Sequence, residues 1–176
     1  MQQTEKILAT LAKDFPNAKS ELNFKNPFQL LVAVILSAQC TDKRVNLVTP
    51  ALFAEADTPE KMAALPVGRI EELIHSCGFY HSKAKYLHDM SVDVVTRFGG
   101  VVPNNIDELR TLAGVGRKTA NVVYAVGFGG QAIAVDTHVF RVSNRLGITD
   151  AKNVLDTEKQ LMAAIPPAQW ADSHHY

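Results

Sequence analysis

The chain has 176 residues, with 18 basic and 18 acidic side chains, six histidines and two cysteines, and 47% of its residues are hydrophobic. It is too apolar and too evenly charged for an intrinsically disordered protein, and it is long enough for one domain or two small ones with a core that needs no covalent staple. Two cysteines exclude a disulfide framework and any site built from four cysteines of this chain, and zero net charge argues against a protein that coats nucleic acid by bulk charge alone.

Hydrophobic residues recur with helical spacing along almost the whole chain. One stripe runs from Ile70 to Cys77 and stops at Gly78, and a second runs from Ala84 to Phe98 before a pair of glycines. In chain order, the pattern predicts helices at 2–14, 27–40, 43–56, 59–64, 68–77, 80–98, 106–112, 117–128, 137–146, 153–164 and 167–175.

Local residue choices support these elements. Pro27, Pro59 and Pro167 stand where a helix begins, at the first helical position that proline tolerates. The β-rich patches at 122–123 and 133–135 are too short for a sheet. We therefore expect an all-α fold of short helices with short connections, whose best internal boundary is residues 129–136.

The sequence indicates neither a membrane-spanning segment nor a signal peptide. Its longest apolar run, 30–36, is far shorter than the roughly 20 residues that a bilayer span needs. The first residues lack the layout of a signal peptide. A reducing, cytoplasmic setting is expected.

Positive charge gathers in one window. Between Arg110 and Arg145 stand five basic side chains and a single acid, Asp136. Such a local excess indicates an anionic ligand, although a chance fluctuation stays open as the alternative.

The same window holds a glycine reversal between two helical patterns. Asn105 can cap the first helix, with Glu108 as its partner three residues later. Gly114 and Gly116 flank Val115 and allow a tight turn that a ligand can approach closely. The second helix then starts with free N–H groups, which suit a phosphate. The alternative is an ordinary helical hairpin whose glycines only turn the chain.

Two residues near this turn could carry chemistry. Lys118 lies in the first turn of the second helix, where the helix dipole, Arg117 and partial burial would all favour the neutral amine. A neutral amine can attack an electrophilic carbon and form a Schiff base. Asp136 precedes an amphipathic helix, so it is either only an N-cap or a rigidly aimed carboxylate as well.

These residues carry a family resemblance. The segments 112–123 and 135–142 resemble the endonuclease III family, bacterial bifunctional DNA glycosylase/AP lyases of the helix–hairpin–helix superfamily. The likeness extends in order over 21–24, 36–42, 78–84 and 172–176, and so covers essentially the whole chain. A sister glycosylase that acts on mismatched adenine or thymine is a further alternative. It is disfavoured because the adenine-specific branch usually lacks the lysine found at 118.

The resemblance implies two helical domains. One is a six-helix barrel at 20–132, with the helix–hairpin–helix at about 106–128. The other combines 1–19 with 133–176. Lys118 would be the nucleophile and Asp136 the activating carboxylate, without a metal. Gln39 would fill the gap left by an everted base, and 78–81 would form the opposing wedge. The residues expected to contact DNA are Gln39, Phe79, Tyr80, His81, Gly114, Val115, Gly116, Arg117, Thr119, His138 and Arg141.

This sequence departs from the family pattern. Ala113 stands where proline is usual, Phe79 where leucine is usual, and Cys40 replaces a smaller residue. The family generally carries a C-terminal loop with four cysteines that bind a [4Fe–4S] cluster. The chain ends before that loop, so we expect no cofactor in it, and a cluster only if residues beyond Tyr176 exist. It is either a piece of a longer protein or a natural short form.

The function implied is base-excision repair. The enzyme would remove oxidised pyrimidines from double-stranded DNA and cut the abasic strand by β-elimination, as a monomer associated with the nucleoid. The alternative is a non-catalytic or weakened DNA-binding form that recognises damage, because the missing C-terminus would remove DNA contacts.

Overall fold

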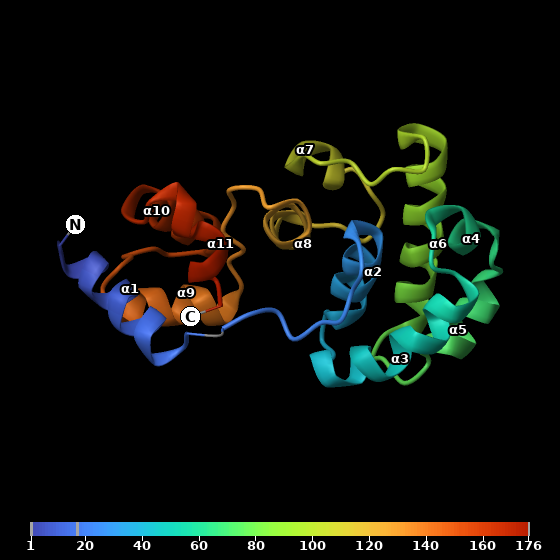
Figure 1. The fold of residues 1–176 in the computed structure, drawn as a ribbon, viewed down its shortest axis with the longest axis horizontal. Helices are drawn as coiled ribbons and strands as arrows, with labels where there is room; N and C mark the ends of the chain where they lie inside the picture. The colour runs from blue at the N-terminus through green and yellow to red at the C-terminus, as the bar shows by residue number, and fades with distance from the viewer. Residues whose placement is uncertain (1, 17, 176) are drawn as a thin grey trace. The chain divides into compact units, whose positions relative to one another are not determined.

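The computed structural model describes residues 2–16 and 18–175, and within them it contains helices and no strands. The all-α fold class is therefore confirmed for the described residues (Figure 1). The helices are α1 (Gln2–Asp14), α2 (Pro27–Ser37), α3 (Asp42–Glu55), α4 (Pro59–Ala64), α5 (Val67–Ile74), α6 (Tyr80–Phe98), α7 (Ile106–Leu109), α8 (Arg117–Val122), α9 (Thr137–Arg145), α10 (Val154–Ala164) and α11 (Trp170–Ser173), with a π-helix at Val123–Gly127 and a 3-10 helix at Pro167–Gln169. None of the helices in the described part is long and apolar enough to cross a membrane.

The chain forms two compact units. One is Glu21–Val123, and the other joins the residues up to Ser20 with those from Tyr124 onward. The domain limits expected from the family resemblance, 20–132 and 1–19 with 133–176, stay a prediction; residues 1, 17 and 176 of these ranges lie outside the described residues.

The Glu21–Val123 unit is built around α2. Every residue of α2 from Phe28 to Leu36 is buried, which explains why this segment reads as an unbroken apolar run rather than as one stripe. The helix packs against α3, α6 and α8, and α6 packs in turn against α4 and α5 (Figure 1). A buried core thereby holds α2 and α6 together.

Side-chain caps set where several helices begin. The Oδ1 atoms of Asn26 and Asn105 accept hydrogen bonds from the backbone N–H groups of Gln29 at 2.9 Å and Glu108 at 2.8 Å. Each such cap stabilises its helix by about 1 kcal/mol. The N-cap predicted at Asn105 is thus confirmed.

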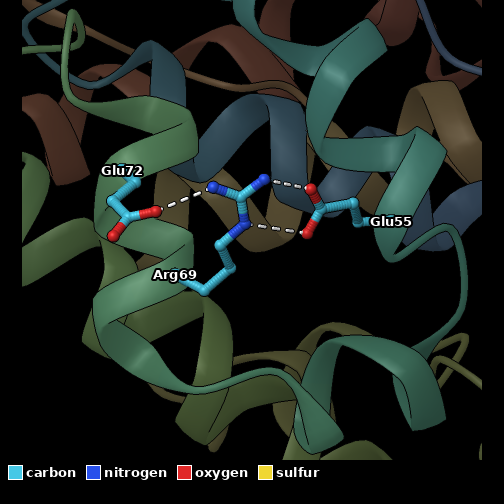
Figure 2. Close-up of polar contacts among 3 residues, drawn as sticks. All are labelled: Glu55, Arg69 and Glu72. Atoms are coloured by element: carbon cyan, nitrogen blue, oxygen red, sulfur yellow. Dashed lines mark hydrogen bonds and ion pairs between the residues drawn. The ribbon is translucent and has the colours of Figure 1, made fainter.

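An ion-pair cluster on the surface joins α3 to α5. Figure 2 shows Arg69 between Glu55 and Glu72, with its Nε donating to Glu55 at 3.0 Å and its Nη1 donating to Glu72 at 2.7 Å. A second donor, Nη2, completes a bidentate pair with Glu55. These hydrogen bonds lower the pKa of the Glu55 carboxyl.

Several predicted helices end earlier than the periodicity indicated. The helix expected at 27–40 stops at Ser37, because Gln39 adopts a left-handed backbone with φ 52°. The helix expected at 106–112 stops at Leu109, and the one expected at 117–128 changes at Val123 into a π-helix. Segment 167–175 is a 3-10 turn followed by the short α11.

The other unit has its own small core. Leu8 of α1 packs with Ile133 and Val135 of the connecting stretch, with Leu161 of α10 and with Ile165 directly after α10. Partly buried residues cover this cluster; they are Val139, Phe140, Ile148, Val154, Met162 and Trp170. The core positions the start of α9, where Asp136 lies.

Candidate functional site

The predicted hairpin is present. Between α7 and α8 the chain turns at Gly114, whose φ of 74° is a left-handed conformation that glycine adopts without strain. Val115 between the two glycines is buried, and Gly116 is the N-cap of α8 without a side-chain hydrogen bond. The turn therefore ends at the first N–H groups of α8.

Gly114 has a second reason to be glycine. A Cβ atom at this position would lie 2.8 Å from the Cβ and Cγ atoms of Tyr86, on α6. A real Cβ essentially never approaches so closely. Tyr86, which no sequence motif indicated, therefore packs directly against the hairpin at Gly114.

Lys118 is the second residue of α8 and is exposed. The partial burial that would have favoured its neutral amine is therefore not found for Lys118. Its charge acts on Asp42, at the start of α3 in the same unit. Burial raises the pKa of the Asp42 carboxyl, the negative charge of Glu21 raises it further, and Lys118 lowers it. No motif pointed to Asp42; only its tertiary position does.

Asp136 caps α9 as predicted. Its Oδ1 accepts a hydrogen bond of 2.8 Å from the backbone N–H of Val139, and the residue is half-buried. Two exposed side chains of α9 lie close together, with Arg141 Nη2 3.4 Å from His138 Nδ1. They line an open groove of about 730 Å³ with Thr137, Phe140, Asn144 and Arg145.

Gln39 and Phe79 share an unusual backbone. In the part of the chain that the structure describes, they are the two non-glycine residues with positive φ, at 52° and 56°. Both are exposed, Phe79 to 67%, so the side chain of Phe79 does not belong to the core.

An open cavity of about 300 Å³ brings several predicted residues together. Gln39, Phe79, Gly114 and Thr119 line it, and the remaining lining residues are Val34, Ile35, Ala38, Ser82, Lys83 and Tyr86. The loop after α2, the start of α6 and the hairpin therefore form one face.

Tyr80 and His81 lie at the start of α6. Their rings contact each other at a tilt of 35° with centroids 4.1 Å apart, and His81 Nδ1 lies 3.1 Å from a carboxylate oxygen of Glu71. Tyr80 is half-buried and contacts His75 edge-on, whereas His81 is exposed. Of the two, His81 presents the more accessible side chain.

Comparison with known proteins decides the family. The model of the HhH-GPD superfamily base excision DNA repair proteins matches residues 32–167. Endonuclease III of Bacillus subtilis is 49% identical over 176 residues, which are 99% of this chain and 80% of the relative. The chain belongs to the endonuclease III family.

Other endonuclease III proteins are also similar to this chain in sequence and in structure. That of Escherichia coli K12 is 43% identical over 97% of this chain and 81% of its own length. A structure of a trapped endonuclease III–DNA covalent intermediate with an estranged adenine matches with a TM-score of 0.95 at 49% identity, covering 99% of this chain and 82% of the other. A thermostable thymine-DNA glycosylase, 20% identical, shares the fold with a TM-score of 0.86.

The residues of this endonuclease III family member do not fit a [4Fe–4S] cluster. Such clusters need four thiolate ligands, and the sequence holds Cys40 and Cys77. Neither cysteine belongs to a group of three or more metal-ligating side chains among the described residues.

Proposed function

We propose that this chain is a bifunctional DNA glycosylase and AP lyase that removes oxidised pyrimidines from double-stranded DNA and cuts the abasic strand. One observation carries the proposal: 99% of the chain matches an endonuclease III trapped on DNA as a covalent intermediate, at 49% identity. The exposed Lys118, two residues after Gly116, supplies an amine in the hairpin segment that resembles the family.

In the proposed chemistry Lys118 is the nucleophile. Its neutral Nζ attacks C1′ of the damaged nucleotide, the bond from C1′ to the base breaks, and the base leaves with the bonding electrons. Asp136 accepts a proton from the attacking amine and stabilises positive charge on the sugar. Opening of the sugar ring then leaves an iminium between Nζ and C1′.

The iminium explains strand cleavage. It makes the C2′ hydrogen acidic, and a base removes that proton. The electron pair of the broken C2′–H bond forms a C2′–C3′ double bond, the C3′–O3′ bond breaks, and the 3′ phosphate leaves with the electrons of that bond. Water then hydrolyses the imine and releases Lys118. This sequence consumes water and needs no electron donor or acceptor.

DNA contacts are proposed from both units. The N–H groups around Gly114 and Gly116, with Arg117 and Thr119, would hold a phosphate. His138 and Arg141 would contact the backbone from α9. Gln39 would fill the space of the everted base, while Phe79, with Tyr80 and His81 beside it, would act as the wedge. Eversion costs a few kcal/mol, which insertion of these side chains offsets.

A cleavage assay on a duplex with one thymine glycol tests the proposal. We expect release of the damaged base and a cut 3′ to the lesion, both lost in Lys118→Ala. Tight binding to the damaged duplex without base release or cleavage would establish the non-catalytic alternative. No relative in the comparisons favours that alternative. We also propose that the protein works on the nucleoid, where its substrate lies.

A further inference from the structure

A buried lysine lies beside the candidate site without a part in the proposed chemistry. Lys83, on the first turns of α6, is 4% exposed, and burial lowers the pKa of its ammonium group. Burying an amine is costly unless it is hydrogen-bonded. Its Nζ donates a buried hydrogen bond of 2.8 Å to the backbone carbonyl oxygen of Leu36.

That carbonyl belongs to the last turn of α2. Carbonyl groups at a helix end have no partner within the helix, and the helix dipole favours a cation there. The Lys83 donor thus caps α2 three residues before Gln39. The contact spans 47 positions of sequence, so it joins two segments that are distant along the chain.

The same lysine is tied to Phe79. Its backbone N–H donates to the carbonyl oxygen of Phe79 at 3.0 Å, which closes the first turn of α6. The two loops also meet directly, because a Cβ atom at Gly78 would lie 3.4 Å from the carbonyl oxygen of Gln39. Lys83 therefore links the loop of Gln39 to the loop of Phe79.

The two residues that Lys83 links, Gln39 and Phe79, both have a strained backbone. Left-handed φ is unfavourable for residues such as Gln39 and Phe79 and persists only where the surroundings hold it. We propose that Lys83 is the positioning residue that holds Gln39 and Phe79 in register for joint insertion into damaged DNA. This inference rests on the proposed function, in which these two side chains enter the duplex, and it does not require Lys83 to touch the DNA.

Affinity for a stable abasic analogue tests the proposal without catalysis. The probe is a duplex with one tetrahydrofuran site, compared with the same duplex undamaged. We expect Lys83→Met to lower the preference for the damaged duplex about tenfold or more, because it leaves the buried carbonyl of Leu36 unpaired. Lys83→Arg keeps a cationic donor and should therefore retain most of the wild-type preference for the damaged duplex. Lys85→Met removes an exposed lysine of the same helix and should change nothing.

A double variant separates positioning from general destabilisation. If Lys83 acts through the wedge, Lys83→Met should add little to the loss caused by Phe79→Ala, whereas independent effects would multiply. Multiplying losses, an unchanged preference in Lys83→Met, or a wild type without any preference would overturn the proposal. If circular dichroism shows Lys83→Met unfolded, Lys83→Gln replaces it, with the same loss expected. Strand cleavage by the wild type is scored separately, so a failure of the proposed chemistry is distinguishable.

Discussion

Tyr86 occupies the space into which any side chain at Gly114 would project, with only 2.8 Å between a Cβ at 114 and the tyrosine Cβ and Cγ atoms. Gly114 also has a φ of 74°, so a substitution there meets both a steric clash and backbone strain. The hairpin is thus locked by a contact from α6.

Gly114→Ala should therefore destabilise the fold by about 1–3 kcal/mol and weaken DNA binding. Gly116→Ala is the matched control, because nothing lies within 4 Å of a Cβ built there and its φ is −89°. Urea unfolding of both variants checks the difference. Equal stability of the two variants would contradict the contact.

Asp136 should show two separable roles. Asparagine is as good an N-cap as aspartate, so Asp136→Asn should keep the stability of α9, while Asp136→Ala should lose about 1 kcal/mol. Base release should fall about 100-fold in both variants, since neither side chain can accept the proton. Melting temperatures and single-turnover rates check this. A fully active Asp136→Asn would leave Asp136 as a cap alone.

The two cysteines should differ in reactivity. Cys77 is 1% exposed, and burial together with a hydrogen bond to Cys40 raises the pKa of its thiol to about 11. Because the thiolate is the reactive form, iodoacetamide at pH 8 should modify the half-buried Cys40 first. Peptide mass spectrometry over time checks the order. Faster labelling of Cys77 in the folded protein would contradict its burial.

The cluster in Figure 2 should make stability depend on pH. Arg69 lowers the pKa of Glu55 in the folded protein, so the contribution is present above the usual value of 4.5 and is lost as the pH falls through the lower folded value. Glu55→Gln should therefore be less stable than the wild type at pH 7 and approach it in strong acid. Urea midpoints at several pH values check this. A constant difference between the proteins would contradict the pairing.

Local features were predictable from the sequence, and tertiary ones were not. The caps at Asn105 and Asp136 and the turn at Gly114 follow from neighbouring residues, so the sequence indicates them directly. The buried hydrogen bond from Lys83 to the carbonyl oxygen of Leu36 at the end of α2 could not be predicted, because the two residues are 47 positions apart in the sequence. The exposure of Lys118 likewise depends on packing around α8.

Borohydride trapping tests the central claim most directly. The purified protein is incubated with a duplex that carries an abasic site, the imine is reduced, and the adduct is digested and mapped by mass spectrometry. We predict one covalent adduct, attached at Lys118, which Lys118→Ala abolishes and Lys85→Ala leaves intact. An adduct at another residue, an adduct that survives Lys118→Ala, or no adduct with the wild type would contradict the account.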